Sequence, residues 1–196
     1  MAYASGTSGR AGLDRGAAIG RYDAVRRRSV DLVGPLTHED MTVQSAPFAS
    51  PAKWHLAHTS WFFEAMLLQR FLGERYAPFN PRFGFLFNSY YNALGEQFTR
   101  AERGLVTRPG VEETLRYRGE IDDRVREFIA GAEDRTLAEA LPIVEIGLHH
   151  EQQHQELLLM DVKHLFSRNP LGPAYRERGA EGAGMETGIG TGVGVV

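Results

Sequence analysis

The sequence predicts an all-α protein, a four-helix bundle with a long aromatic crossover between its second and third helices. Four long stretches carry apolar residues at helical spacing and are bounded by residues that start or end helices. No stretch of the chain makes a convincing strand. Four amphipathic helices bury their apolar stripes most readily against one another, which is the architecture of a bundle.

The first two helices are expected within residues 14–36 and 50–73. The first stretch ends at Gly34-Pro35, a pair that stops a helix. Its apolar residues recur at near-helical spacing and are Ile19, Tyr22, Val25, Val30, Leu32 and Val33. The second stretch opens with Ser50 as the expected N-cap and Pro51 at the first helical position, and it ends at Gly73.

The third and fourth helices are expected within residues 109–131 and 136–170. The third stretch has acidic residues in its first turn and Gly131 at its end. Its predicted apolar stripe consists of Val111, Leu115, Ile121, Val125 and Phe128. Pro142 interrupts the fourth stretch and Asn169-Pro170 stops it, so its main part is expected over residues 143–167.

The connections between these helices are uneven. We expect short links between the first and second helices and between the third and fourth. Residues 73–110 form a long crossover that contains FNPRFGFLFNSYYNALG. A loop of this length is usually functional when it is ordered. Its aromatic residues either plug the core or line a binding site, and the sequence leaves both interpretations open.

The chain has the size of one domain with two tails. We expect the bundle to span residues 16–175. Residues 1–15 are small and polar, and residues 176–196 are rich in glycine without a helical or strand period. Both tails are expected to be disordered.

Composition excludes several classes of function. The chain has 22 basic and 25 acidic residues and a net charge of -3, so no basic field attracts a phosphate backbone and nucleic acid is not an expected partner. It has no cysteine, so any metal must be bound by His, Asp or Glu. We find neither the apolar core of a signal peptide nor the ~20 apolar residues of a membrane span, and we expect a cytoplasmic protein without a membrane partner.

Four of the seven histidines lie in HHEQQHQELLLMDVKH, residues 149–164. Residues four apart on a helix share a face, so His150 and His154 can reach one ion. His149 points ~100° away from His150. This stretch therefore predicts a metal-chelating pair.

A third ligand is expected from the second predicted helix. His58 is followed closely by aromatic residues that normally face a core, and a buried histidine there needs a partner. A third imidazole completes an open catalytic metal site. His55 is the rival, because it lies one turn earlier on nearly the same face, and spacing does not separate the two. His38 and His164 are expected at the surface.

The same segment also spells H-E-x-x-H, the zinc-protease pattern in which Glu151 would be the general base. No third histidine follows in the required register, and little helix remains downstream to carry one. No strand is available to align a peptide substrate. The sequence therefore disfavours a protease.

Several long segments carry a family resemblance: SPAKWHLAHTSWFFE, FGFLFNSYYNALG, ERGLVTRP and HHEQQHQELLLMDVKHLFSRNPLGPAY. From about Arg21 to Tyr175 the chain resembles the N-terminal DinB-like domain of the ergothioneine-biosynthesis sulfoxide synthases, the EgtB family, which is similar to the OvoA sulfoxide synthases. The resemblance implies a DinB-like bundle.

The resemblance also implies an activity and a cofactor. Enzymes of this family use non-haem Fe(II) and O₂ to join the thiol of cysteine or γ-glutamylcysteine to the imidazole of trimethylhistidine, producing a sulfoxide. The family ligands fall on His58, His150 and His154, which favours His58 over His55. Zinc or another divalent ion is the alternative metal.

Further residues are implied to bind substrate. Gln153 corresponds to the family glutamine that contacts trimethylhistidine. Arg100 and Arg103 resemble the paired arginines that hold the carboxylates of the thiol donor, a role suited to guanidinium groups. Tyr91, in the segment FNSYY, is expected to line the same pocket.

The chain departs from the family after NPLGPAY. Family members continue into a domain that resembles formylglycine-generating enzymes, whereas this sequence continues into a glycine-rich end. We expect a truncated chain that forms little sulfoxide alone, with a separate formylglycine-enzyme-like domain as a candidate partner. The alternatives are a stand-alone DinB-like metal protein that acts on thiols, and an inactive fragment.

Overall fold

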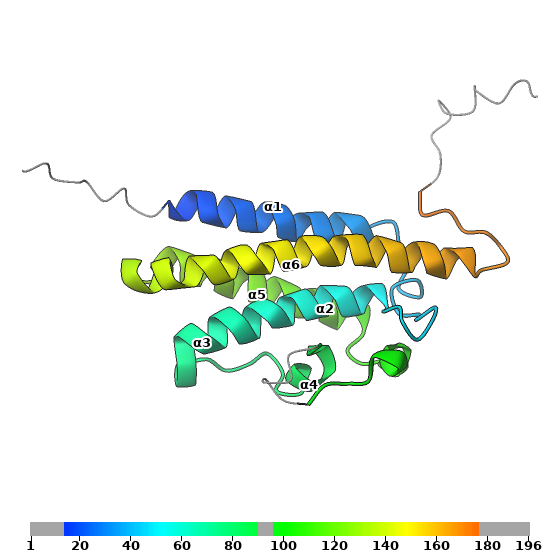
Figure 1. The fold of residues 1–196 in the computed structure, drawn as a ribbon, viewed down its shortest axis with the longest axis horizontal. Helices are drawn as coiled ribbons and strands as arrows, with labels where there is room; N and C mark the ends of the chain where they lie inside the picture. Colours follow the sequence, from blue (N-terminus) through cyan, green and yellow to red (C-terminus); the bar gives the residue numbers. More distant parts are fainter. Residues whose placement is uncertain (1–13, 90–95, 177–196) are drawn as a thin grey trace, which may run out of the picture.

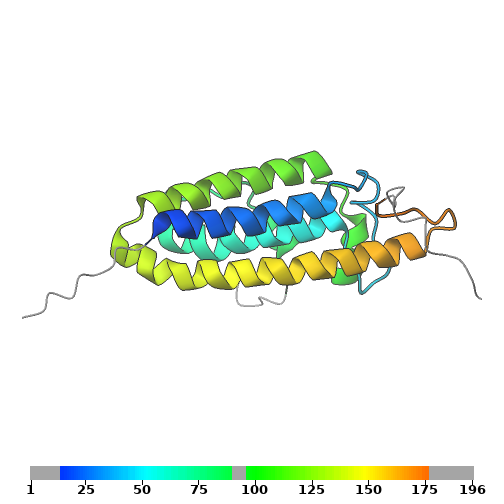
Figure 2. The same ribbon diagram turned by 90° about the horizontal axis from the view of Figure 1, so that it is seen from above.

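The computed structural model describes residues 14–89 and 96–176, and these residues contain helices and no strand (Figure 1). Four long helices lie side by side along the long axis of the molecule (Figures 1 and 2). They are α1 (Arg15–Val33), α2 (Ala52–Phe63), α5 (Val111–Gly131) and α6 (Asp134–Ser167). The predicted all-α fold is confirmed.

The direction of the helices explains the long crossover. In Figure 1, α1 and α6 run one way along the bundle, while α2 and α5 run the other way. Because α2 and α5 are parallel, the chain must travel back along the bundle between them. α3 (Gln69–Leu72) ends the helix that begins with α2. The described part of the returning segment then contains the short helix α4 (Phe83–Phe87) and 3₁₀ turns at Gly73–Arg75 and Arg100–Leu105.

The N-terminal ends of α1 and α2 are made differently. Asp14 caps α1 by accepting a hydrogen bond from the amide of Ala17 at 2.8 Å. Pro51 precedes α2, and no side chain caps that end. The predicted N-cap role of Ser50 is therefore wrong. Its amide instead donates to the Asp161 carboxylate at 2.9 Å, and this hydrogen bond ties the start of α2 to α6.

The second predicted helix is continuous but not uniform. After Phe63 it passes through a π-helical segment, Glu64–Leu68, before it becomes α3. The buried Glu64 carboxylate accepts hydrogen bonds from Tyr117 at 2.5 Å and Tyr76 at 2.9 Å. It also accepts from the amide of Phe79 at 2.9 Å. Glu64 thus fastens the start of the crossover to α5.

The predicted start of the fourth helix and the predicted length of the first link are both wrong. α6 begins at Asp134 rather than near residue 143, and Pro142 lies inside it. Pro142 is exposed, while Leu137 and Ala140 before it are buried, so apolar burial outweighs the hydrogen bond that proline removes. The connection between α1 and α2 is residues 34–51, which is not the short link we expected.

Aromatic side chains of the crossover plug one side of the core. Phe83 packs edge-on against Tyr117 of α5, with ring centroids 4.9 Å apart. Phe79 and Phe87 pack against the same tyrosine. This confirms the plug interpretation of the crossover. Leu115, predicted on the buried stripe of α5, is 37% exposed, because the helix turns its Tyr117 face toward the crossover instead.

A polar network lies buried where α1, α5 and α6 meet. The Glu151 carboxylate is fully buried and accepts hydrogen bonds from Arg26 at 2.7 Å and Ser29 at 2.5 Å. Arg118 of α5 donates to the same carboxylate. Arg26 also donates to Asp122 at 2.5 Å. Desolvation raises the pKa of Glu151, but the charges of Arg118 and Arg26 and the hydrogen bonds from Ser29 and Arg118 outweigh it and hold that pKa at about 2.

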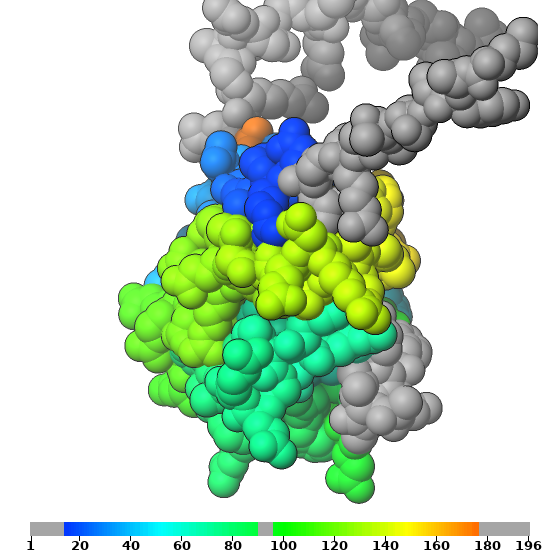
Figure 3. All heavy atoms as spheres, turned by 90° about the vertical axis from the view of Figure 1, so that its left-hand side faces the viewer, coloured from blue at the N-terminus to red at the C-terminus, as the bar shows by residue number. Residues whose placement is uncertain are grey.

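The end of the bundle near the α5–α6 turn is seen in Figure 3, where the start of α6 lies between α1 and the end of the α2–α3 helix. A cavity of about 710 Å³ opens there between α3 and the α5–α6 turn, lined by residues such as Phe71, Tyr76 and Phe128. It contains no histidine. Among the described residues, no helix is long and apolar enough to span a membrane.

Candidate metal centre

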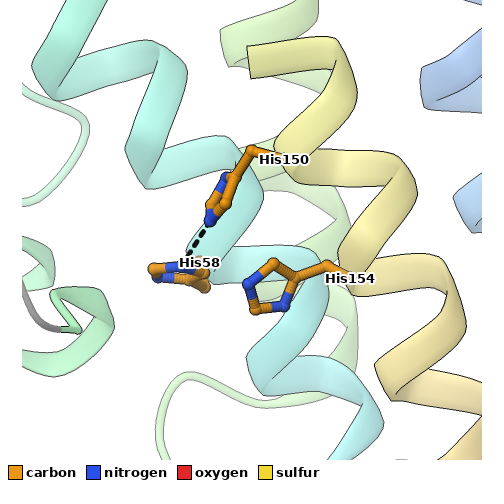
Figure 4. Close-up of side chains that lie close together, drawn as sticks. All are labelled: His58, His150 and His154. Carbon is orange, nitrogen blue, oxygen red and sulfur yellow. Dashed lines mark hydrogen bonds between the residues drawn. The ribbon is translucent and has the colours of Figure 1, made fainter. Parts of the chain in front are cut away.

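Three histidines from two helices converge at one point of the bundle (Figure 4). His58 comes from α2, and His150 and His154 come from α6. Each offers a ring nitrogen, and these nitrogens all lie within 4.8 Å of one another. The structure thus places the three predicted ligands together.

The close approach of α2 and α6 depends on Gly147. A Cβ at this position would lie 2.5 Å from the Phe63 ring and 3.0 Å from the Phe62 ring. Gly147 is about one turn before His150, so the missing side chain lets this part of α6 lie against α2. The His150 and His154 side chains then face His58.

The orientation of His58 is fixed on several sides. Its Nδ1 lies 2.6 Å from the carbonyl oxygen of Phe87 and must donate its proton there, which leaves a lone pair on Nε2. Trp54 stacks on the imidazole at 4.7 Å and 11°, and Trp61 packs against it at 5.6 Å and 20°. The Arg103 guanidinium lies 3.4 Å from the centre of the Trp54 ring.

The geometry of His150 fits a bound cation. Its Nε2 lies 3.1 Å from the Nε2 of His58. Two nitrogens that are each ~2.1 Å from one ion, at angles between 90° and 109°, are about 3.0–3.4 Å apart. Within the described part of the chain, the buried Nδ1 of His150 has no hydrogen-bond partner. A cation would use both Nε2 lone pairs, which would otherwise face each other or require a proton between them.

His154 is supported by groups behind it. Its Nδ1 lies 2.9 Å from the Nδ1 of His55, and the Nε2 of His55 lies 3.0 Å from the Asp161 carboxylate. Both ring nitrogens of His55 are therefore engaged by other side chains. His55 is not part of the converging set of ligands, although spacing had left it open.

Burial keeps these imidazoles neutral, which is the form that binds metal. Desolvation lowers the pKa of His150 to about 4. Desolvation also lowers the pKa of His58 and of His154 well below the ordinary value, and the neighbouring imidazoles lower both further. At neutral pH the site therefore presents three uncharged donors.

The three histidines open into a pocket of about 300 Å³. Among the other residues that line it are Arg100, Arg103, Gln153 and Leu157. Arg103 is buried and donates to Ser50 at 2.9 Å and to Ser89 at 3.0 Å.

Two of these pocket residues are exposed. Arg100 donates to the carbonyl oxygen of Phe48, and Gln153 lies on α6 next to His154. Tyr91, the remaining predicted substrate residue, lies outside the described residues. The crossover thus supplies a polar wall to the pocket as well as an aromatic plug.

Glu151 does not face this pocket. Its carboxylate is occupied by Arg26, Arg118 and Ser29 on the side of α1 and α5. A zinc-protease base must be free to take a proton from water at the metal. The H-E-x-x-H pattern here consists of two histidines that face the pocket and a carboxylate between them that is held by buried cations, and this arrangement disfavours a protease.

The remaining histidines lie outside the site. His149 is exposed and pairs with Glu145 at 3.1 Å on the same helix. His38 is exposed, and His164 is half-buried with its Nδ1 2.8 Å from the Ser45 hydroxyl.

Asp161 also belongs to the site and was not predicted from the sequence. One signal could have found it. Asp161 follows His154 by seven residues, two helical turns, so both side chains lie on the same face of α6. A carboxylate in that register is a ready partner for a histidine of the facing helix.

Comparison with known proteins gives a family. A search of curated proteins found no significant match. A family model of the DinB superfamily matches residues 21–158, a range that includes all three converging histidines. Proteins of this superfamily typically bind a divalent metal. The match covers well over half of the chain, and the protein belongs to the DinB superfamily.

Proposed function

We propose that the chain is the Fe(II)-binding domain of a sulfoxide synthase of the ergothioneine-biosynthesis type. The observation that carries the proposal is the set of His58, His150 and His154, three neutral donors that face a pocket lined by guanidinium groups. The long segments that resemble this enzyme family include all three histidines and Arg103, and Arg100 lies two residues before one of these segments.

The proposed reaction balances with O₂ as the oxidant. A thiol R–SH and the imidazole C–H of trimethylhistidine lose two protons and form the C–S bond, and the sulfur takes one oxygen atom. The second oxygen atom leaves as water. The substrates supply all four electrons that reduce O₂. Fe(II), when bound by the three imidazoles, would supply the O₂ chemistry that this step requires.

The side chains of this protein would place the substrates. Arg103 is held rigidly by two serines and by Trp54, so its guanidinium is a fixed positive group at the pocket wall. Arg100 is a second guanidinium at the same pocket. Together they suit the two carboxylates of γ-glutamylcysteine or the one of cysteine. Gln153, which lines the pocket beside His154, is the proposed contact for trimethylhistidine.

The three histidine donors also support a second candidate function, that of a zinc protein. Three neutral histidines with an open side also describe many catalytic zinc sites. In that case the protein would be a stand-alone DinB-like metal protein that activates a thiol, and no oxygen would be consumed.

One experiment separates the two functions. Protein purified without oxygen is loaded with either Fe(II) or Zn²⁺ and given trimethylhistidine, O₂ and either cysteine or γ-glutamylcysteine. It is assayed with and without an added formylglycine-enzyme-like domain, the proposed partner. The expected result is sulfoxide in the mass spectrum of the Fe(II) sample and none for zinc or for a His58→Ala control. No sulfoxide with either donor, with or without the added domain, would reject the proposal.

A further inference from the structure

A hydrogen-bonded chain of three side chains leads away from the metal centre. The Asp161 carboxylate accepts from the Ser50 amide at 2.9 Å and lies 3.0 Å from the Nε2 of His55. The Nδ1 of His55 lies 2.9 Å from the Nδ1 of His154. Asp161 and His55 are 6% and 3% exposed, so water does not compete for these contacts.

The chain of contacts assigns every proton along it. A carboxylate accepts hydrogen bonds, so the Nε2 of His55 carries a proton and donates it to Asp161. In a neutral imidazole the other nitrogen is then an acceptor, so the Nδ1 of His55 accepts from His154. The Nδ1 of His154 must therefore carry its proton. This leaves the lone pair of His154 on Nε2, the nitrogen that remains for a metal.

We propose that His55 and Asp161 are positioning residues that fix the tautomer and the ring orientation of the ligand His154. The inference rests on the proposed metal site. Ligating histidines commonly donate their second ring N–H to a supporting group, and loss of that group typically costs about 10- to 100-fold in metal affinity. Here the supporting group is a second histidine, itself oriented by a buried carboxylate.

The hydrogen-bonded chain Asp161–His55–His154, which we call the relay, also explains why two histidines lie on one face of α2. His58 is held by a backbone carbonyl, that of Phe87, and so needs no side-chain support. Among the described residues, the Nδ1 of His154 meets the His55 side chain rather than a backbone carbonyl. His55 fills this place one turn before His58, and the two neighbouring imidazoles have different tasks, ligation and support.

Two variants of His55 test the role. Glutamine keeps one acceptor and one donor, so His55→Gln can accept from His154 and donate to Asp161. Leucine fills a similar space and can do neither. We expect His55→Leu to weaken Co²⁺ binding by about 10- to 100-fold and His55→Gln to bind nearly as well as the parent, measured by titration of the visible absorption.

The tautomer itself is measured in metal-free protein. Two-bond ¹H–¹⁵N correlation spectra of the ring nitrogens should show His154 protonated on Nδ1 in the parent and in His55→Gln, with the Nε2-protonated form appearing in His55→Leu. A parent His154 protonated on Nε2 would overturn the proposal, even if the leucine variant failed to fold. A folded His55→Leu variant that binds Co²⁺ as tightly as the parent would also overturn it. So would an equal loss of Co²⁺ affinity in His55→Leu and His55→Gln with the His154 tautomer unchanged.

The two readouts separate this inference from the proposed metal function. If the parent binds no divalent ion, the metal site fails, but the tautomer of His154 still reports on the relay. If the parent binds metal and the leucine variant binds it equally well, the metal site stands and the relay fails.

Discussion

Glu151 and His150 are neighbours in the chain but serve different parts of the molecule. The imidazole faces the metal pocket, whereas the carboxylate compensates two buried guanidiniums. Successive side chains on a helix point about 100° apart, so one segment of α6 can serve both. The H-E-x-x-H pattern alone does not show this division of roles.

Replacing Glu151 with glutamine should therefore affect stability rather than metal binding. The buried charge of Arg118 would lose its carboxylate partner, and breaking a buried ion pair in this way costs about 3–5 kcal/mol. Urea unfolding measures the loss, and Glu156→Gln, at an exposed position of the same helix, is the control. A stable Glu151→Gln protein with altered reactivity at the metal would instead support a general base.

The buried imidazoles also make metal-free protein sensitive to acid. In the unfolded chain histidine takes up a proton as the pH falls through about 6.5. His150 does so in the folded protein only near pH 4. Between these values the unfolded state binds more protons, so the folded state loses stability as the pH falls. The slope is up to about 1.4 kcal/mol per pH unit for each such histidine.

Urea unfolding at pH 7, 6 and 5 in the presence of a chelator measures this slope. The His154→Ala variant should show a shallower slope, because one depressed imidazole is gone. His149→Ala should match the parent, because His149 is exposed. Stability that is independent of pH over this range would show that the imidazoles are not held neutral.

Helix boundaries set by local sequence were predicted correctly, whereas those that depend on packing against other helices were not. Gly34-Pro35 ends α1 at Val33 because neither residue favours continuation of a helix, and that signal is local. The passage of α6 through Pro142 was missed, because it depends on the burial of Leu137 and Ala140 against other helices. The π-helical segment Glu64–Leu68 likewise has no local signature and depends on contacts with α5 and the crossover.

The same distinction applies to the site. The His150 and His154 pair follows from helical periodicity alone. The choice between His55 and His58 does not, because both are buried on one face of α2. Their separate tasks depend on the position of α6 along α2 and on the Phe87 carbonyl, which comes from the crossover. Neither contact can be read from spacing in the chain.

The distance between α2 and α6 should control the affinity for metal. Gly147→Ala introduces a methyl group 2.5 Å from the buried Phe63 ring, so either this ring or the two helices must shift near His150. We expect weaker Co²⁺ binding and a loss of stability of about 1–3 kcal/mol. The control is Gly119→Ala in α5, where an added Cβ meets nothing within 4 Å and helix propensity predicts a gain of about 0.5–1 kcal/mol. Equal behaviour of the two variants would contradict the close-approach account.

In the assembled bundle, the three histidines bring α2 and α6 together at a pocket that residues of the crossover line. The crossover supplies the Phe87 carbonyl to His58 and places Arg103 against Trp54. Because α2 and α5 are parallel, the chain must return along the bundle between them. This returning crossover also forms one wall of the pocket. Because the metal would link two helices of the folded state, loading it should raise the stability of the bundle by about 3 kcal/mol at 100 times the dissociation constant.

We expect His58, His150 and His154 to bind one divalent ion. The most direct measurement is the metal content and Co²⁺ affinity of the parent and of single alanine variants at these positions, with His149→Ala as the control. We expect one ion per chain in the parent and in the His149→Ala control. We also expect an affinity loss in each of the three variants larger than the roughly 10- to 100-fold expected for a supporting residue. Stoichiometric, parent-like binding in all three variants would contradict this expectation.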